Sequence, residues 1–366
     1  MKRKIRPNKV VFIGALPPPL TGMTQVSADI VKLIKQKARV HVRSTSPAGS
    51  SRNVIYHVSR ASKSIQAIFE IPFLRLIGFK SIYLPVDDKF GGVWTAIFAF
   101  VGRIMMMQVY LHHHSYYYII EPTVVMKILV NVAGPRARHI VLCEEMKAVF
   151  SDMYGSAKEF IVSPNPVAEP EVEAELQVDD QGALKLGLLS NLTEEKGVFD
   201  FLQICDDLRA QGLNVHGVIA GPISSEVRER FLVDIGKRSE YIEWMGPVTG
   251  SSKEKFFSHI NLFVFPTKYR TESFGLVILE SLIRGVPVFA PRRGCICIFE
   301  ELKDAYIIPL DQDFKSSVIS KIFDLKFYKY DACDWQKTRS ECSMLGNKMN
   351  DEHKRVQVSL VEVISS

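Results

Sequence analysis

The chain has 366 residues, which is enough for two domains that each bury a hydrophobic core. Hydrophobic residues make up 47% of it and charged residues 23%, a composition that excludes an intrinsically disordered protein. The net charge of +6 is unevenly distributed, because residues 1–165 hold 22 basic and 9 acidic residues (net +13) and the remainder holds 24 and 31 (net −7).

The basic first half predicts an anionic partner, either a lipid surface or a phosphate-bearing acceptor. An ordinary solvated basic surface is the alternative. Nucleic acid is not expected, because no stripe of aromatic residues alternates with the basic ones.

Neither a signal peptide nor a membrane span is expected. The apolar run of residues 10–16 is short and is followed by three prolines instead of a small-residue cleavage site. The longest apolar stretch, residues 91–111, contains Arg103 near its middle, so we expect a helix over 94–102 that leads into a strand. The six cysteines show no zinc-ligand spacing and no CxxC pair, which indicates reduced thiols and a cytoplasmic protein.

The first half alternates between strand-like and helix-like segments. Strands are expected over residues 9–15, 38–44, 81–86, 106–115 and 139–144, and helices over 24–36, 94–102 and 146–153. Repeated strand and helix units of this kind are typical of a parallel, doubly wound sheet.

A proline-rich and acidic stretch within residues 164–183 is expected to link this domain to a second one. In the second series, strands are expected over residues 183–192, 214–221, 242–246, 261–267 and 286–291, and helices over 196–212, 227–238, 251–260 and 275–284. The predicted fold is therefore α/β, with Rossmann-like domains at 1–165 and 166–345 facing a central cleft. The segment from about 334 to the end is expected to be helical, with residues 346–366 packing back onto the first domain.

Two glutamates in the segment 271–281, TESFGLVILES, need an explanation. Glu280 lies within an apolar helix, where a carboxylate is costly unless it is hydrogen-bonded, and an ion pair with Arg284 four residues later is one explanation. Glu272 precedes the helix, beside backbone amides that attract anions, although it could be a solvated loop charge. Eight residues of helical rise is about 12 Å, a distance that a nucleotide sugar could span.

The stretch 266–290, PTKYRTESFGLVILESLIRGVPVFA, resembles the signature of the retaining glycosyltransferases of family 4, which have the GT-B fold. Both glutamates, Phe274-Gly275-Leu276 and the following Gly-Val-Pro-Val agree with it. Four other stretches also resemble the family. PPPLTGM (17–23) resembles its N-terminal glycine loop, and SPNPV (163–167) resembles its Pro-Asn before the linker. LTEEKG (192–197) resembles its donor phosphate loop, and RRGCI (292–296) resembles the loop following the strand after the signature helix.

The resemblance implies a role for each matching residue. Glu280 would bind ribose, Glu272 would lie at the donor sugar, and the donor would contact Ser273, Phe274, Gly275 and Leu276 through the backbone. Lys196 would neutralise the leaving diphosphate, unless it is only a surface lysine that begins a helix. Gly22 would let the loop of the first domain approach the phosphates, or would serve only the turn.

One position departs from the family, which usually has an arginine five residues before the lysine. Asn191 stands there and carries no charge, so Arg270 and Arg293 are candidates for phosphate binding in its place, if they are not simple surface charges.

Three consecutive histidines follow a predicted strand. Only His112 and His114 can share a face of that strand, which argues against a metal site. The resemblance places His114 near the donor sugar, and a hydrogen-bonded structural histidine is the alternative.

These features predict a retaining glycosyltransferase that moves a sugar from a nucleotide sugar to a glycan or lipid-linked acceptor, in assembly of a bacterial surface polysaccharide. Catalytic roles are expected for His114, Glu272 and Lys196. The resemblance implies no metal or other cofactor. A nucleotide-sugar epimerase of the same fold and a non-catalytic binding subunit remain open. A dehydrogenase is not expected, because GALPPPLTG (14–22) lacks the GxGxxG spacing.

Overall fold

The computed structural model describes residues 8–18, 21–46, 54–155, 159–170 and 182–366. The chain folds as two compact units. Unit 1 comprises residues up to Asn165 together with His353–Ser366, and unit 2 comprises Pro166–Glu352. The basic cluster of residues 2–6 and part of the predicted linker, residues 171–181, lie outside the described residues.

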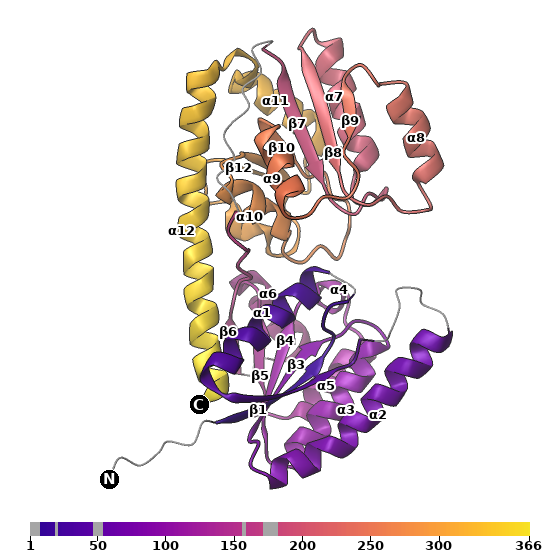
Figure 1. The fold of residues 1–366 in the computed structure, drawn as a ribbon, viewed down its shortest axis with the longest axis vertical. Helices are drawn as coiled ribbons and strands as arrows, with labels where there is room; N and C mark the ends of the chain where they lie inside the picture. The colour runs from indigo at the N-terminus through magenta and orange to yellow at the C-terminus, as the bar shows by residue number, and fades with distance from the viewer. Residues whose placement is uncertain (1–7, 19–20, 47–53, 156–158, 171–181) are drawn as a thin grey trace. The chain divides into compact units, whose positions relative to one another are not determined.

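Unit 1 contains a six-stranded parallel sheet with the order β2-β1-β3-β4-β5-β6 (Figure 1). Its strands are β1 (Lys9–Gly14), β2 (Arg39–Ser44), β3 (Ser81–Val86), β4 (Gln108–His113), β5 (Arg138–Val141) and β6 (Glu159–Val162). The central strands β1, β3 and β4 are almost entirely buried, as expected for a parallel sheet covered on both faces.

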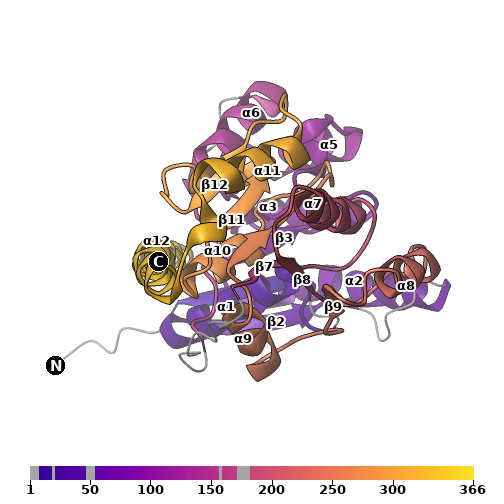
Figure 2. The ribbon, with the colours of Figure 1, turned by 90° about the horizontal axis from the view of Figure 1, so that it is seen from above.

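Six helices connect these strands. They are α1 (Gly22–Lys37), α2 (Val54–Leu76), α3 (Gly91–Ile104), α4 (Tyr117–Ile120), α5 (Val124–Ala133) and α6 (Glu144–Tyr154). Because parallel crossovers are right-handed and the chain reverses direction after β2, α1 covers one face of the sheet and α2, α3, α5 and α6 cover the other (Figure 2).

Helix α2 has no counterpart among the sequence predictions. Apolar residues occur all round it, so no single stripe with a period of 3.6 residues is visible, and Pro72 interrupts the pattern further. Its buried face is narrow and consists of Ser64, Ala67, Ile71 and Leu74. Two small residues, one isoleucine and one leucine on that face gave too weak a signal to reveal the helix.

Unit 2 contains a second six-stranded parallel sheet with the order β12-β11-β10-β7-β8-β9. Its strands are β7 (Leu184–Leu189), β8 (Val215–Ala220), β9 (Ile242–Trp244), β10 (Leu262–Val264), β11 (Val288–Pro291) and β12 (Ala305–Ile308). Its helices are α7 (Val198–Ala210), α8 (Arg228–Gly236), α9 (Ser251–Ser258), α10 (Leu276–Ile283), α11 (Phe314–Asp324) and the short 3-10 turns η1 (Gly294–Phe299) and η2 (Phe327–Lys329). The predicted arrangement of two doubly wound parallel sheets is confirmed.

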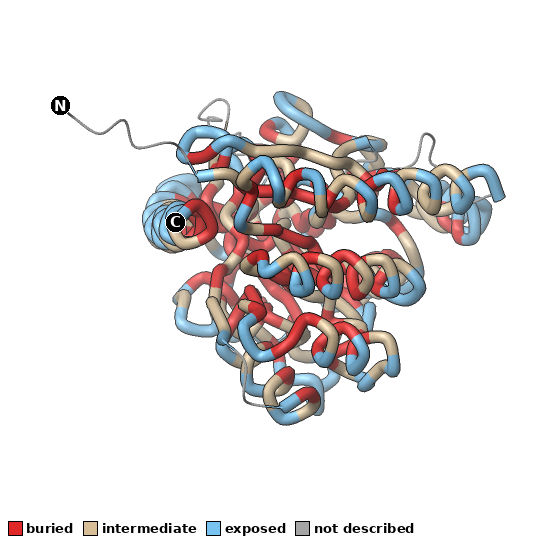
Figure 3. The backbone as a smooth tube through the Cα atoms, turned by 90° about the horizontal axis from the view of Figure 1, so that it is seen from below, coloured by how far each residue is buried: buried red, intermediate tan, exposed pale blue. Residues whose placement is uncertain are grey.

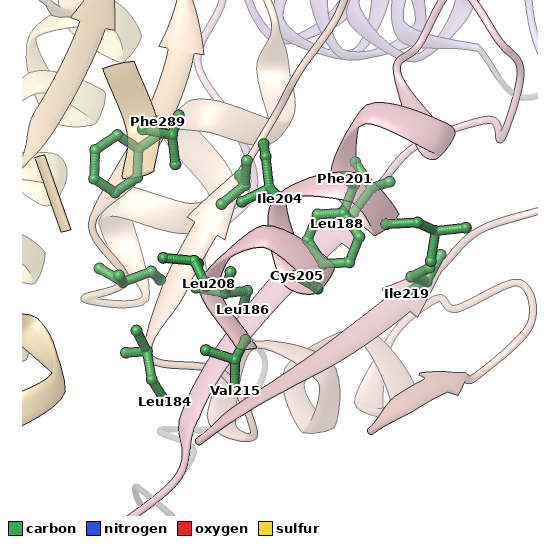
Figure 4. Packing of buried hydrophobic residues seen from close by; sticks show 14 of the residues in the cluster. Leu184, Leu186, Leu188, Phe201, Ile204, Cys205, Leu208, Val215, Ile219 and Phe289 are labelled. Atoms are coloured by element: carbon green, nitrogen blue, oxygen red, sulfur yellow. The ribbon is translucent and has the colours of Figure 1, made fainter. Parts of the chain in front are cut away.

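The core of unit 2 lies between this sheet and the pair α7 and α11 (Figure 4). Phe201 of α7 is fully buried there among the leucines of β7. Gly187 and Gly217 leave room for neighbouring side chains, because a Cβ would lie 2.3 Å from Ile260 at the first position and 2.6 Å from Ile242 of β9 at the second.

The chain ends in one long helix, α12 (Ala332–Ser365), which serves both units. In unit 2, Arg339 is buried and donates hydrogen bonds to the carbonyls of Phe257 and Ile260, and burial lowers its pKa to about 10. In unit 1, Tyr110 donates a hydrogen bond of 2.8 Å to the Val363 carbonyl. The predicted return of the C-terminal helix to the first domain corresponds to residues from His353 onward.

Two other expectations concern the cysteines and the membrane. Cys205, Cys297, Cys333 and Cys342 carry free thiols, but Cys143 and Cys295 do not, so the prediction of six reduced thiols is wrong for these two. Whether a cysteine keeps a free thiol depends on what lies near its sulfur in the folded chain, and the spacing of cysteines in the sequence does not show this.

Every helix in the described ranges is too short or too polar to span a bilayer.

Replacement of Phe201 by alanine is expected to lower the free energy of unfolding by about 3–5 kcal/mol, because it removes a fully buried ring from the core of unit 2. Chemical denaturation of the full chain measures the change. Leu232→Ala on α8, where the side chain is 41% exposed, is the control and should change the value by less than about 1 kcal/mol. Equal losses in the two variants would contradict this description of the core.

Candidate functional site

Lys196 and Glu272 form an ion pair at the carboxyl end of the unit 2 sheet. Lys196 Nζ lies 2.5 Å from Glu272 Oε2, and the two side chains are 22% and 12% exposed. The ammonium group also lies 4.8 Å from the centre of the Tyr269 ring and 5.7 Å from that of Phe265. These contacts hold a cation and a carboxylate together although they are 76 residues apart in the sequence.

The loop that carries Lys196 is held tightly against β10 and the residues that follow it. Gly197 has φ +79°, and a Cβ there would lie 2.0 Å from the carbonyl oxygen of Pro266, so only glycine fits. The Thr193 hydroxyl accepts a hydrogen bond from the Lys196 amide, and the Lys268 amide donates to the Glu195 carbonyl at 2.7 Å. The position of Lys196 is therefore set by backbone packing.

Glu272 is fixed by the turn that leads into α10. Gly294 has φ +53°, and a Cβ there would lie 2.1 Å from the Glu272 carbonyl oxygen. The Cys295 amide donates to the Ser273 carbonyl at 2.7 Å, and Gly275 caps the helix in the left-handed conformation with φ +66°. Glu272 consequently lies just before a helix whose first amides have no intrahelical partners.

Arg293 and Arg270 add positive charge beside this pair. Arg293 Nε donates to the Thr267 carbonyl at 3.1 Å, and the Thr267 hydroxyl donates to Glu272 Oε2 at 3.4 Å. Burial and the proximity of Arg270 lower the pKa of Arg293, while Glu272 opposes that shift. The predicted phosphate-binding candidates Arg270 and Arg293 thus lie in the same electrostatic environment as Glu272.

Glu280 forms an ion pair with a lysine, Lys253 of α9. Lys253 Nζ lies 3.0 and 3.1 Å from the two Glu280 oxygens, and the two side chains are 26% and 22% exposed. The alternative ion pair with Arg284 is wrong, because the Arg284 guanidinium donates to both oxygens of Glu254 at 2.6 and 2.7 Å. It reaches only the backbone carbonyl of Glu280, at 3.0 Å.

The structure also places the predicted donor contacts Phe274, Asn191 and Leu276 in unit 2. Phe274 is buried with its ring against Phe299, so only its backbone is available to a ligand, as the resemblance implies. Asn191 is exposed and follows β7, and the Ser190 hydroxyl donates to its carbonyl at 3.0 Å. Leu276 begins α10.

Gly22 and the histidines belong to unit 1. Gly22 was expected in a loop, but it is the first residue of α1, after the Thr21 N-cap. The Thr21 and Thr24 side chains form a reciprocal capping box, so helical geometry starts earlier than the prolines suggested. Gly22 therefore lies at a helix N-terminus, where amides also attract anions.

All three histidines are buried at the end of β4. The rings of His112 and His114 lie 3.9 Å apart on one side, which confirms that these two share a face. His113 points the other way and contacts His139, at 2.9 Å between ring nitrogens, and the Tyr118 hydroxyl. Neither ring nitrogen of His114 has a hydrogen-bond partner among the described residues, so the hydrogen-bonded structural role is not what the structure shows.

Burial lowers the pKa of His114 to about 3, so the imidazole is neutral at physiological pH. No group of three or more His, Cys, Asp or Glu side chains within the described part of the chain is arranged to hold a metal ion.

Sequence reasoning did not single out Lys253, Thr267, Gly197 or Gly294. The glycines lay within stretches already recognised, and a glycine directly after Lys196 was a usable signal for a tight approach. No signal pointed to Lys253, because its contact with Glu280 joins residues 27 positions apart on different helices.

Residues 183–324, which lie within unit 2, match the family model described as "Glycosyl transferases group 1". The match includes Lys196, Glu272 and Glu280. The chain is also 29% identical over 158 residues to the O-antigen biosynthesis glycosyltransferase WclY of Escherichia coli, an alignment that covers 40% of this chain and only 38% of the relative.

Solved structures resemble the whole chain. Anabaena Alr3699/HepE in complex with UDP superposes with a TM-score of 0.71 at 15% identity, over 98% of this chain and 99% of the other. WaaG, a glycosyltransferase involved in lipopolysaccharide biosynthesis, gives 0.64 at 12% identity over 98% and 100%. At these identities the likeness shows the fold alone, and it confirms the predicted GT-B class.

Replacement of Glu254 by glutamine is expected to lower the free energy of unfolding by about 3 kcal/mol, because it leaves the Arg284 guanidinium buried without its charge partner. Glu280→Gln should cost less than about 1 kcal/mol, since Glu280 is more exposed and its partner Lys253 can turn to water. Denaturation of both variants under the same conditions compares them. A larger loss for Glu280→Gln would overturn the assignment of Glu254 as the structural partner of Arg284.

The free energy of unfolding should rise with pH between about 3 and 6.5, in part through His114. In that window the unfolded histidine binds a proton and the folded one does not, because its pKa is lowered to about 3. His114→Gln should flatten this dependence, as measured by denaturation at pH 4.5, 5.5 and 7. An unchanged slope would show that His114 does not contribute.

Proposed function

We propose that this protein is a retaining glycosyltransferase that moves a hexose from a nucleoside diphosphate sugar to a glycan or lipid-linked acceptor. The observation that carries the proposal is the Lys196–Glu272 ion pair just before the N-terminus of α10, together with Glu280 further along the same helix. It combines a cation for a phosphate, a helix start that favours anions and two carboxylates that can accept hydrogen bonds from sugar hydroxyls.

Lys196 would stabilise the leaving diphosphate. Cleavage of the bond between the sugar and the phosphate leaves negative charge on the diphosphate, and a positioned ammonium group nearby lowers the free energy of that state. Without donor, Lys196 is neutralised by Glu272. When the donor binds, Lys196 would leave Glu272 and contact a phosphate. Glu272 would then accept hydrogen bonds from the sugar hydroxyls. Arg270 and Arg293 would add charge that Asn191 does not supply, and we expect no metal ion to be needed.

Glu280 would bind the ribose. A carboxylate has about four acceptor positions, so it can keep its contact with Lys253 and still accept bonds from two hydroxyls. The lysine would hold the carboxylate in one orientation before the donor arrives. HepE is described in complex with UDP-glucose, which makes UDP-sugars the first donors to test.

His114 and Gly22 would contribute from unit 1. A neutral, buried imidazole with two unpartnered nitrogens can donate or accept one hydrogen bond at a sugar hydroxyl without the cost of a buried charge. Gly22 would add helix N-terminal amides for a phosphate. We name no nucleophile for the retaining reaction.

The partial match to WclY supports a role in O-antigen or other surface polysaccharide assembly. The basic composition of residues 1–165 supports a phosphate-bearing, lipid-linked acceptor and contact with the inner face of the membrane from the cytoplasm.

Nucleoside diphosphate sugars should raise the thermal midpoint of the full chain by mass action, and Glu280→Gln should weaken donor binding at least tenfold while the midpoint without ligand stays close to wild type. Glu229→Gln, an exposed glutamate on α8, is the matched control and should bind donor normally. Wild-type affinity in Glu280→Gln would refute the ribose role.

Analysis of the reaction products distinguishes a glycosyltransferase from an epimerase and from a non-catalytic binding subunit. With donor and a lipid-linked or glycan acceptor, we expect a glycoside whose anomeric configuration, read by NMR, matches that of the donor. An epimer formed from donor alone would establish the epimerase. Donor binding without product across a broad acceptor panel would favour the binding subunit.

A further inference from the structure

The outer face of α2 carries a row of exposed apolar side chains. They are spaced three, four or seven residues apart along the helix, so they form one stripe on the side opposite the buried residues. The stripe consists of Val54, Val58, Ile65, Phe69, Phe73 and Leu76. Phe69, Phe73 and Leu76 are 76%, 62% and 86% exposed, whereas single exposed apolar residues are ordinary on a protein surface. A helix that is apolar on both faces needs a second apolar environment.

The neighbouring helices extend this surface. Helix α3 packs against both α2 and α5. Phe90 at the start of α3 is 89% exposed, and Phe100 and Ile104 are also exposed. Val124 and Ile128 continue the pattern on α5. We call these exposed apolar residues, together with the α2 stripe, the α2–α3–α5 surface. Figure 3 shows the alternation of buried and exposed residues along the helices.

The charge of this surface is net positive, although Arg60 of α2 is paired with Asp87. Helices α2, α3 and α5 contain five basic residues and a single acid, Glu70, which pairs with Arg43 at 2.5 Å. Among the residues that the structure describes, Arg75 and Arg103 donate to backbone carbonyls and to no carboxylate, and Lys127 is exposed on α5. A second copy of the chain docking by a twofold axis would bring these positive groups together, which disfavours self-association.

We propose that the α2–α3–α5 surface binds the interface of an anionic lipid bilayer, with its aromatic and aliphatic side chains among the acyl chains and its basic residues at the headgroups. The inference specifies the surface for the membrane contact in the proposed function and rests on that function for its role. Apolar burial and attraction to anionic headgroups are the two terms that bind helices at membrane interfaces. Both are present on one face of unit 1.

This location has a consequence for a lipid-linked acceptor. Helix α3 is the next element after β3, and the neighbouring strand β4 ends at the histidines. The exposed Phe90 is therefore four residues beyond Val86, which ends β3 at the carboxyl edge of the sheet, and His114 follows the end of the neighbouring strand β4. An acceptor anchored in the bilayer could reach that edge from the membrane surface.

Flotation of the full chain with vesicles tests the proposal. Vesicles of phosphatidylcholine with 30% phosphatidylglycerol should bind the protein, and pure phosphatidylcholine vesicles should bind it at least tenfold more weakly. The double variant Phe69→Asp/Phe73→Asp should lose at least tenfold in binding to the anionic vesicles. The matched control is Leu232→Asp/Val233→Asp, which places the same charges on exposed apolar positions of α8 in unit 2 and should bind as wild type.

Several results would overturn the surface assignment. They are no binding to anionic vesicles, equal binding by the α2 variant, or a dimer in light scattering that the α2 variant abolishes. Donor-induced thermal stabilisation, measured on the same proteins, keeps the two proposals apart. Donor binding without vesicle binding rejects only the lipid surface, and vesicle binding without donor binding rejects only the proposed function.

Discussion

The ion pair between Lys196 and Glu272 is the interaction on which the candidate site depends. Each partner is held by a glycine that leaves no room for a Cβ, Gly197 against the Pro266 carbonyl and Gly294 against the Glu272 carbonyl. The loops after β7, β10 and β11 are thereby locked together at one edge of the sheet, where open parallel sheets place their ligands. The pairing means that neither the ammonium group nor the carboxylate is left as an unpaired, partly buried charge.

Much of the fold could be predicted, because strands buried on both faces and helices with one apolar stripe leave strong patterns. Helix α2 escaped detection because its outer face is apolar as well. The signature around Glu272 and Glu280 identified the site, but the partner of Glu280 did not follow from it. Arg284 has the right spacing on the helix, yet it pairs with Glu254, because tertiary contacts between α9 and α10 outweigh the weak attraction of neighbours on one helix.

The charge asymmetry along the sequence now has a structural counterpart. The acidic half contributes the carboxylates of unit 2, each oriented by a lysine, while the basic half contributes helices with few acids and much exposed apolar surface. A surface that contacts only water is not expected to combine few acidic residues with much exposed apolar area in the same three helices. The carboxylates proposed to bind the donor and the surface proposed to bind lipid therefore belong to different units of the chain.

The last feature is helix α12, which starts in unit 2 and ends in unit 1. Unit 1 is consequently discontinuous in the gene: its final segment, from His353 onward, is translated only after the whole of unit 2. During synthesis the first sheet must wait, with the β5 and β6 side of its core incomplete, until the segment from His353 onward has left the ribosome. For the same reason, a simple truncation cannot yield an intact first unit, and separating the two units would require a fused or co-expressed terminal helix.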